Sequence, residues 1–297
     1  MLFRSGNPIL EEKNITKNTI FVIEASSYQI DYSKYFETNI ALILNISPDH
    51  LERHKTFKNY VKTKLKLIKK QKNNSIALIE KNNELIRDIL KSQKVKSKIK
   101  KVDFKDYDNF YKKIKNNYFK NLSNIKNLSF VLKLSNILKL DNSKILKVVN
   151  SFKGLNYRQQ IVYNKKNFLI INDSKSTSFS STVPLLQSYE NIYWILGGLA
   201  KKGDKLNLNK KYFKKIKAFI YGTNKAFFLN VLKNKCRLHS SKNLKDILPK
   251  LFLDIKKNKN GKKTILFSPA AASFDQFKNF EERGRYFNQL LKKYINA

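Results

Sequence analysis

The sequence predicts an α/β fold in which mostly parallel strands are covered by helices on both faces. Short apolar runs alternate with segments whose apolar residues recur at three- and four-residue steps. That alternation is typical of parallel strands joined by amphipathic helices. Nearly every polar cluster directly follows one of the apolar runs. Because ligands of open parallel sheets bind at the carboxyl ends of strands, these clusters are candidates for a functional site.

The first half of the chain begins with two apolar runs, at 20–23 and 40–44, which predict buried strands. Residues 82–118 are lysine-rich and weakly patterned. The other elements expected in this half are a helix, a short strand and two further helices, at 57–70, 75–79, 124–139 and 143–152.

The pattern changes near Phe152-Lys-Gly154, where the helical spacing gives way to strand-like runs. We therefore expect a domain boundary at about 153, with domains at 1–153 and 154–297. The strands expected in the second domain lie at 167–171, 193–196, 218–221 and 263–267.

The charge balance is strongly basic, with 61 Lys and Arg against 22 Asp and Glu and a formal net charge of +39. Such a charge suits a nucleic acid, an anionic membrane surface or an anionic substrate. However, only seven of the 61 are Arg, the residue preferred for bidentate phosphate recognition. The lysines are spread along the whole chain, which favours compositional drift over specific nucleic-acid binding.

The single cysteine, Cys236, cannot form an intramolecular disulfide, which fits a reducing compartment. No apolar run approaches the roughly 20 residues that cross a bilayer, and residues 1–5 lack the apolar core of a signal peptide. We expect a soluble cytoplasmic protein without membrane insertion.

Three polar positions of the first half attract attention. Glu24 follows the first apolar run and could bind Mg²⁺, although a carboxylate beside a helix start at Ser26 is the simpler alternative. His50 follows the next run, where a turn is the alternative. Lys64 lies fourteen residues after His50, and by itself it is a solvated surface charge.

The string Asn45-Ile-Ser-Pro-Asp-His-Leu-Glu-Arg-His54, followed by Tyr60-Val-Lys-Thr-Lys64, resembles the middle-domain signature of the Mur ligases. The resemblance implies that Glu24 binds a first Mg²⁺ and that His50 and a carbamylated Lys64 bind a second. Condensing a neutral lysine with CO₂ turns a cation into an oxygen ligand suited to a hard metal.

Two further matches concern the nucleotide. Asn121-Leu-Ser-Asn-Ile-Lys-Asn127 resembles the family's His-Asn-x-x-Asn helix start, with Asn124 and Asn127 as the matching asparagines and Ser123 in place of the His. Gly154-Leu-Asn-Tyr-Arg158 resembles the Gly-Leu-x-His-Arg link, with Tyr157 in place of the His. The resemblance implies that Asn124, Asn127 and Arg158 contact ATP.

The loop Asn172-Asp-Ser-Lys-Ser-Thr177 resembles the Asn-Asp-Ser-Lys-Ala-Thr-Asn loop of the D-glutamate-adding members, with Ser176 in place of the Ala. The resemblance implies that Asp173 faces ATP, that Lys175 steadies an acyl phosphate and that Thr177 touches the incoming amino acid. A plain turn is the alternative for Asn-Asp-Ser.

The remaining matches lie after two later runs. Leu196-Gly-Gly-Leu-Ala-Lys201 is similar to the family's Gly-Gly-x-x-Lys loop, which implies that Lys201 pairs with a carboxylate of D-glutamate. The run 268–284 matches the signature of the same members almost throughout, which implies a carboxylate-binding Ser273 and a packing residue at Phe280. A serine at a helix start is well placed to hold an anion.

The sequence contains no Gly-x-x-x-x-Gly-Lys-[Ser/Thr] loop to cradle phosphates, and the family's Gly-Asn-Ile-Gly-x-Pro stretch matches only at Gly6-Asn-Pro8. We therefore expect an N-terminal truncation, a split-gene product or an incomplete gene sequence, with a separately encoded N-terminal half as a possible partner.

The resemblance implies a partial central domain followed by a Rossmann-like C-terminal domain. It also implies an ATP-dependent ligase that adds D-glutamate to UDP-N-acetylmuramoyl-L-alanine in peptidoglycan synthesis, through an acyl phosphate and with two Mg²⁺ ions. The alternatives are an amide ligase of the folylpolyglutamate synthase kind and a catalytically silent fragment.

Overall fold

The computed structural model describes residues 2–3, 13, 15–165, 167–258 and 261–295. It divides into two compact units, residues 1–106 and 107–297. Both contain parallel strands and helices, so the predicted α/β class is confirmed. The expected boundary at 153 falls inside the second unit, and as a boundary between family domains it stays a prediction. The match at Gly6-Asn-Pro8 lies outside the described residues.

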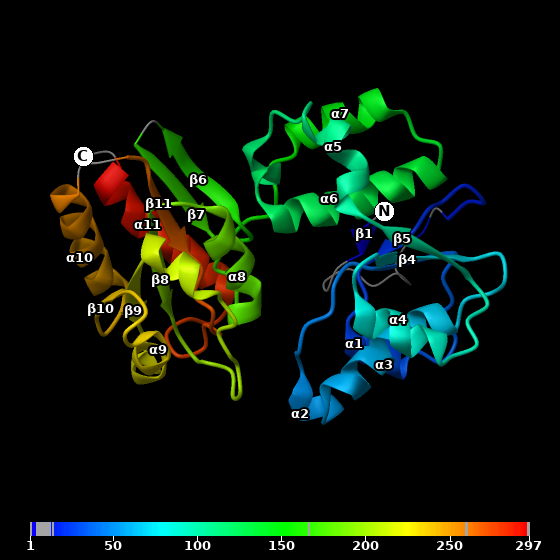
Figure 1. The fold of residues 1–297 in the computed structure, drawn as a ribbon, viewed down its shortest axis with the longest axis horizontal. Helices are drawn as coiled ribbons and strands as arrows, with labels where there is room; N and C mark the ends of the chain where they lie inside the picture. Colours follow the sequence, from blue (N-terminus) through cyan, green and yellow to red (C-terminus); the bar gives the residue numbers. More distant parts are fainter. Residues whose placement is uncertain (1, 4–12, 14, 166, 259–260, 296–297) are drawn as a thin grey trace. The chain divides into compact units, whose positions relative to one another are not determined.

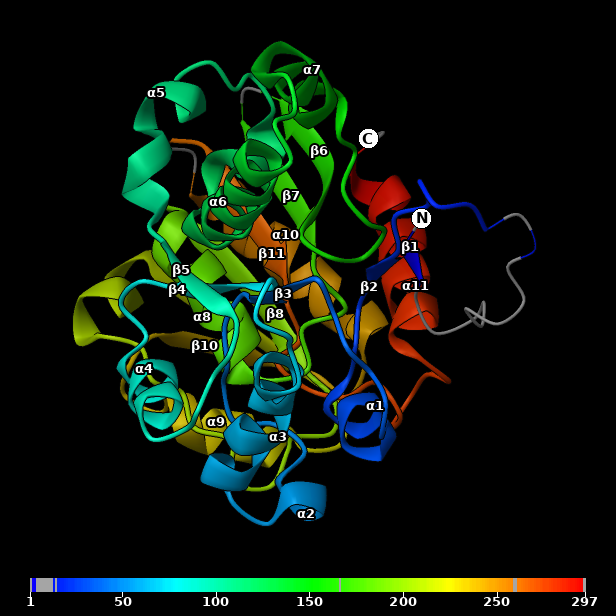
Figure 2. The same cartoon turned by 90° about the vertical axis from the view of Figure 1, so that its right-hand side faces the viewer.

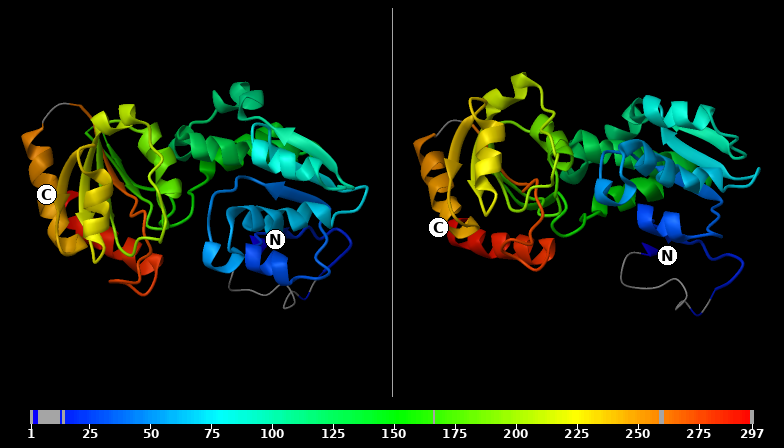
Figure 3. Two further views of the ribbon diagram at one scale, coloured as in Figure 1. Left: turned by 60° about the horizontal axis from the view of Figure 1, so that its bottom comes forward. Right: turned by 90° about the horizontal axis from the view of Figure 1, so that it is seen from below.

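The first unit is built on the parallel sheet β3 (Ile40–Ile43), β4 (Ile76–Glu80) and β5 (Lys98–Val102), in that order. α3 (Phe57–Lys69) and α4 (Glu84–Lys91) bury their apolar faces against β3 and β4. α1 (Ser27–Tyr32) packs against α3, and the short α2 (Leu51–His54) precedes it. Figure 3 shows this unit in blue and cyan.

One expectation for the first unit was wrong. The run 20–23 is not a buried strand: only β2 (Val22–Ile23) is extended, and it pairs with β1 (Leu2–Phe3) in a separate two-stranded sheet. Ile20 and Val22 are 64% and 49% exposed as a result. The segment 82–118 holds more structure than its pattern indicated, because α4 and β5 lie in it.

The second unit contains a six-stranded sheet in the order β10-β9-β8-β11-β7-β6. All pairs are parallel except β6–β7, so the four strands predicted here and their mostly parallel arrangement are confirmed. Sequence patterning missed β6 and β10, the two edge strands. The strands are β6 (Gln160–Lys165), β7 (Phe168–Asn172), β8 (Ile192–Gly197), β9 (Ile216–Tyr221), β10 (Arg237–Ser240) and β11 (Lys263–Phe267).

Helices cover both faces of this sheet (Figure 1). α8 (Phe179–Ser188), η4 (Lys210–Lys215) and α9 (Lys225–Leu232) enclose one apolar cluster, which includes the only tryptophan, Trp194. α10 (Leu244–Lys257) and α11 (Phe280–Ile295) enclose the other. The core strands are therefore apolar on both faces, which explains why their runs are continuous rather than alternating.

A group of helices precedes the sheet in the second unit (Figure 2). α6 (Leu122–Ile137) and α7 (Asn142–Ser151) pack through Leu128, Leu132 and Val149. Asn121 caps α6 by accepting a hydrogen bond from the backbone of Asn124. The shorter helices are η2 (Phe104–Tyr107), α5 (Asp108–Tyr111) and η3 (Asn117–Lys120). In the described part of the chain, no helix is both long and apolar enough to cross a membrane.

Candidate functional site

The carboxyl ends of β7, β8, β9 and β11 meet at one edge of the second unit's sheet, and a loop follows each of them. The loops span 173–178, 198–204, 222–224 and 268–279. Lys175, Thr177, Lys201 and Ser273 all lie in these loops, as the strand-end argument predicted.

The loop after β7 is held in place by hydrogen bonds to α11. The Asn172 side-chain amide donates to the Gly284 carbonyl and to Asn288 Oδ1, both at 2.8 Å, and its Oδ1 accepts from the Ser174 backbone at 3.1 Å. The last bond closes an Asx turn, so a turn and a functional loop coexist at Asn-Asp-Ser. The loop geometry is therefore set by α11, more than 100 residues away in sequence.

Arg283 is a buried guanidinium that joins two of the loops. It is fully buried, and it donates to Ser174 Oγ (3.0 Å), the Ser174 carbonyl (2.7 Å) and the Ala271 carbonyl (2.9 Å). Its Nη1 and the Tyr221 hydroxyl are buried and make no hydrogen bond of standard geometry in the described part of the unit, but the two groups lie close enough to influence each other's pKa. Burial lowers the pKa of Arg283 and raises that of Tyr221 to about 12.

The loops after β8 and β11 are paired directly. Leu199 and Ala272 exchange two backbone hydrogen bonds of 2.9 Å, which brings the segments carrying Lys201 and Ser273 together. Gly198 makes the close approach possible: its φ is +127°, and a Cβ there would lie 2.4 Å from the Ala272 carbonyl oxygen. This pairing supports the sequence-based grouping of Lys201 with Ser273.

Lys175 and Phe280 also come together. Lys175 Nζ lies 4.2 Å from the centroid of the Phe280 ring, a cation–π distance. The Lys175 backbone donates to the Tyr157 carbonyl, and Ser174 Oγ donates to the Phe280 carbonyl. Thr177 is partly exposed, and Ser273 is buried. The residues predicted to hold D-glutamate thus occupy neighbouring loops of one sheet edge.

Asp173 is the most perturbed carboxyl group of the site. Its Oδ2 accepts from Ser268 Oγ at 2.8 Å and its Oδ1 accepts from the Gln159 backbone at 3.1 Å. Burial raises its pKa to about 7, and the Ser268 and Gln159 bonds and the charges of Arg158 and Arg283 only partly oppose this. Asp173 therefore changes charge near neutral pH in the ligand-free protein.

The residues predicted to contact the nucleotide differ in exposure and do not all lie in the loops described above. Arg158 interacts with the charge of Asp173 and lies between Tyr157 and Gln159, whose φ angles of +61° and +49° are strained for residues with side chains. Asn124 is buried and donates to the Tyr118 carbonyl at 2.7 Å. Asn127, one turn further along α6, is exposed.

The first unit holds a separate polar cluster around Lys64. The negative charges of Glu24 and Asp49 act on the Lys64 ammonium, whose Nζ donates to the Ala25 carbonyl at 3.4 Å. His50 Nδ1 lies 3.5 Å from the Tyr28 hydroxyl, and the His50 backbone donates to Asp49. The structure therefore brings the predicted Glu24, His50 and Lys64 into one region of this unit.

The donor set of this cluster fits a divalent cation only in part. Carboxylates suit Mg²⁺, whereas a lysine ammonium repels it. Burial lowers the pKa of Lys64, which favours the neutral amine that can react with CO₂. Across the described residues, no group of three or more His, Cys, Asp and Glu could hold a metal. The carbamylation of Lys64, which would add an oxygen ligand beside Glu24 and His50, stays a prediction.

Sequence reasoning missed the loop after β9. Asn224 Oδ1 accepts from the Ala200 backbone at 2.9 Å, and Asp275 Oδ2 accepts from the Thr223 backbone at 3.2 Å. These bonds link the β9 loop to those after β8 and β11. The available signal was positional, since Gly222-Thr-Asn224 directly follows an apolar run.

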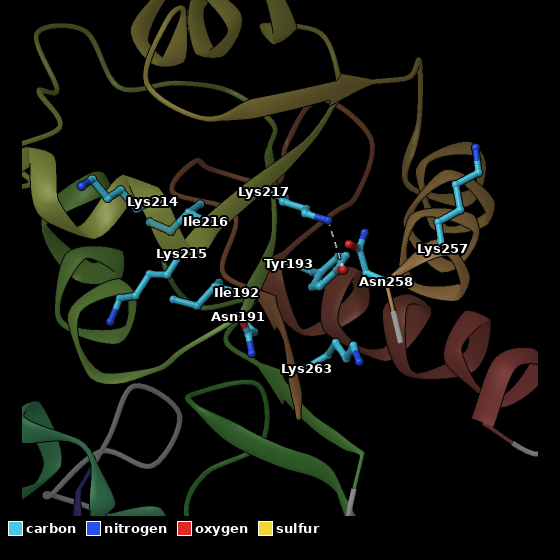
Figure 4. Close-up of a pocket in the computed structure, with 10 residues that line it drawn as sticks. All are labelled: Asn191, Ile192, Tyr193, Lys214, Lys215, Ile216, Lys217, Lys257, Asn258 and Lys263. Atoms are coloured by element: carbon cyan, nitrogen blue, oxygen red, sulfur yellow. Dashed lines mark hydrogen bonds between the residues drawn. The ribbon is translucent and has the colours of Figure 1, made fainter. Parts of the chain in front are cut away.

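A basic pocket of about 550 Å³ lies at the opposite edge of the same sheet, where β8, β9 and β11 begin (Figure 4). Three of its five lysines already have partners: Lys217 pairs with Asp254 at 2.6 Å, Lys215 with Glu190 at 2.8 Å, and Lys263 donates to the Gly261 carbonyl. Its lining is Asn191, Ile192, Tyr193, Lys214, Lys215, Ile216, Lys217, Lys257, Asn258 and Lys263. This pocket lacks the row of aromatic residues on which single-stranded nucleic acid stacks.

Comparison with known proteins agrees with the motifs. The Mur ligase middle domain matches residues 7–145. A UDP-N-acetylmuramoylalanine–D-glutamate ligase of Rickettsia prowazekii is 36% identical over 97% of this chain and 68% of its own length. A ligase of the same name from Wolbachia pipientis is 30% identical over 97% of this chain and 70% of its own length. The chain thus spans about two thirds of these relatives.

Solved structures show the same fold. A MurF ligase from Thermotoga maritima, determined in complex with ADP, is 16% identical with a TM-score of 0.62, covering 93% of this chain and 68% of that one. A MurF from Acinetobacter baumannii is 14% identical with a TM-score of 0.66, covering 93% and 64%.

Proposed function

We propose, from the premise that the chain belongs to the Mur ligase family of ATP-dependent ligases, that it adds D-glutamate to UDP-N-acetylmuramoyl-L-alanine. The observation that carries the substrate assignment is the paired loops after β8 and β11, which group Lys201 with Ser273 beside Lys175 and Phe280. An ammonium and a buried hydroxyl at a sheet edge form a carboxylate site. The curated relatives at 30–36% identity carry names with the same amino acid.

ATP and Mg²⁺ are part of this proposal. Bound together, they would supply the phosphoryl group that activates the alanine carboxylate. Glu24, His50 and a carbamylated Lys64 would hold metal, and Arg158, Asp173, Asn124 and Asn127 would face the nucleotide. Asn127 is exposed and Arg158 is partly exposed, whereas Asn124 is buried and its side-chain amide donates to the Tyr118 carbonyl.

The chain's own residues then serve the second half of the reaction. Lys201, Ser273 and Thr177 orient D-glutamate so that its amine faces the acyl phosphate. The nitrogen attacks the carbonyl carbon, a C–N bond forms, phosphate leaves with the C–O bond electrons and the amine releases a proton. Lys175 neutralises negative charge on the phosphate as it leaves, and the Phe280 ring holds the Lys175 ammonium in place.

The main rival is a ligase of the folylpolyglutamate synthase kind, which shares the fold at a TM-score of 0.50 and 10% identity. That likeness concerns the fold alone, and the relatives' names favour D-glutamate. A phosphate-binding loop supplied by a separate N-terminal segment stays a prediction, as does a cytoplasmic location.

The test is phosphate release from ATP that depends on both D-glutamate and UDP-N-acetylmuramoyl-L-alanine. It is run with the 297-residue chain alone and with an added N-terminal segment of a relative. We expect turnover only in the mixture, because this sequence has no phosphate loop. Turnover with a folate and L-glutamate, and none with D-glutamate, would contradict the proposed substrate.

A further inference from the structure

A chain of buried hydroxyl groups starts at Asp173 and ends in the loop that carries Lys175 and Thr177. Ser268 Oγ lies 2.8 Å from Asp173 Oδ2, Thr182 Oγ1 lies 2.8 Å from Ser268 Oγ, and Ser176 Oγ lies 2.6 Å from Thr182 Oγ1. None of these three hydroxyl residues is more than 2% exposed. The chain crosses from the end of β11 to α8 and back to the loop after β7.

Counting protons fixes the direction of these bonds, because a hydroxyl donates one hydrogen bond. When Asp173 is ionised it can only accept, so Ser268 must donate to it. Thr182 must then donate to Ser268, and Ser176 must donate to Thr182. The Ser176 hydroxyl proton is therefore used in the hydrogen bond to Thr182 Oγ1 in α8.

Protonating Asp173 on Oδ2 allows the opposite direction. Asp173 then donates to Ser268, Ser268 to Thr182, and Thr182 to Ser176. The Ser176 proton is then free to bond to Ser181 Oγ at the start of α8, at 2.8 Å, or to the Ser178 carbonyl of its own loop, at 3.5 Å. Ser176 thus changes partners according to whether Asp173 carries a proton.

We propose that Ser268, Thr182 and Ser176 are positioning residues that transmit the protonation of Asp173 to the loop carrying Lys175 and Thr177. The inference rests on the proposed function, since it couples the nucleotide side of that site to its D-glutamate side. An anion or cation beside Asp173 would change its proton occupancy and thereby the hydrogen bonds that hold the D-glutamate loop.

The surroundings of Asp173 favour such a switch. It is buried, and the charged or titratable groups that face it are Arg158 from the preceding link, Arg283 from α11, Tyr118 from η3 and Tyr189 after α8. No acidic side chain is among these four. Burial, which raises the pKa of Asp173 to about 7, places the change of charge near neutral pH.

Ser176 supplies the last hydroxyl group of the series. Replacing Ser176 by Ala removes that hydroxyl while leaving the Ser268–Asp173 bond in place, and it is therefore a conservative test of the last step.

The test follows two signals by NMR as pH rises from 5 to 9, using the full chain without ligand. The first is the side-chain carboxyl carbon of Asp173, and the second is the set of backbone amides at 176–178. In the wild type we expect both to titrate with one midpoint. In Thr182→Val and Ser176→Ala, the carboxyl carbon should still titrate, and the amide shifts should fall to less than about half. Ser180→Ala, an exposed residue outside the hydroxyl chain, should behave as the wild type.

A binding experiment then tests whether this relay, the hydrogen-bonded series Ser268, Thr182 and Ser176, affects the proposed D-glutamate site. The dissociation constant of D-glutamate, measured at pH 6 and pH 8, should differ at least about threefold in the wild type and become equal in Ser176→Ala. Unchanged loop titration in both Thr182→Val and Ser176→Ala would overturn the relay. Because the NMR arm needs no ligand, the titration decides the relay even if the wild type alone binds no D-glutamate, and the turnover test with the added N-terminal segment decides the proposed function.

Discussion

The two polar clusters of this protein are built in opposite ways. In the second unit, the candidate site rests on buried groups: Arg283, Asp173 and Ser268 are at most 5% exposed and are hydrogen-bonded across distant segments. In the first unit, the His50 side chain is 41% exposed and Glu24 is exposed as well. The first cluster depends on local surface geometry, whereas the second is held by the packing of its unit.

The difference shows what fixes the side-chain positions in each site before a ligand binds. Buried hydrogen bonds to charged groups are strong and expensive to leave unmade, so the loops of the second unit are fixed before a ligand arrives. In the first unit only the Lys64 amine is half-buried, and the exposed Glu24 carboxylate and His50 imidazole beside it are the groups that a bound cation would organise. Changes in the two regions should therefore differ in their effect on stability.

The largest expected effect is at Gly197. Gly197→Ala should destabilise the second unit by roughly 4 kcal/mol or more, because the new Cβ would lie 1.9 Å from the Tyr221 carbonyl at a φ of +140°. Urea unfolding followed by Trp194 fluorescence reports this unit alone, since Trp194 is the only tryptophan. Gly203→Ala is the control: its φ is +77° and nothing lies within 4 Å of the new Cβ, so only about 1–2 kcal/mol should be lost. Equal losses would mean that the close approach of Gly197 to the Tyr221 carbonyl is unimportant.

The next effect concerns the pH dependence of stability through Asp173. Its pKa is raised from 3.8 to about 7 in the folded state, so between these values the folded state binds a proton that the unfolded state releases. The stabilisation is therefore fully present below pH 3.8 and is lost as pH rises through about 7. The full difference is up to about 4 kcal/mol.

Asp173→Asn cannot ionise and should remove this dependence. Trp194 fluorescence in urea should show the stability of the variant relative to the wild type rising by about 3 kcal/mol between pH 5 and pH 8. If the two proteins lose stability in parallel between pH 5 and 8, Asp173 is not the buried group that titrates.

A smaller effect is expected on ligand affinity. Lys201→Ala should weaken D-glutamate binding about tenfold or more, because a charge-assisted hydrogen bond contributes roughly 1.5–3 kcal/mol. Calorimetric titration measures this directly, and the exposed neighbour substitution Lys202→Ala is the matched control. Equal affinities for Lys201→Ala and the wild type would remove Lys201 from the site.

The smallest effect is expected in the first unit. Glu24→Gln and His50→Ala should each change stability by less than about 0.5 kcal/mol, because both side chains are substantially exposed. Amide hydrogen exchange in β4 reports this unit. Leu65→Ala, on the buried face of α3 next to Lys64, should instead cost about 2–5 kcal/mol. A large loss from Glu24→Gln would show that the first cluster is also a structural element.

Sequence patterning located most of the second unit because its core strands are buried on both faces. A continuous apolar run such as Trp194-Ile-Leu196 is typical of a strand that is buried on both faces. The same reasoning failed at 20–23, where an equally apolar run lies at the surface in a two-stranded sheet. It also missed β10, because an edge strand that reads Arg237-Leu-His-Ser240 carries little apolar signal.

The sequence by itself determined which residues follow the strands, and hence that Lys175, Lys201 and Ser273 would share one sheet edge. It could not determine that Asp173 is buried with a raised pKa, or that its partner is Ser268, 95 residues later. The mostly parallel pairing follows from the alternation of apolar runs with helical segments, whereas the strand order is known only from the structure. The proton affinity of a carboxyl group follows from which distant segments exclude water from it and which hydroxyls they bring, and only the packed tertiary structure decides that.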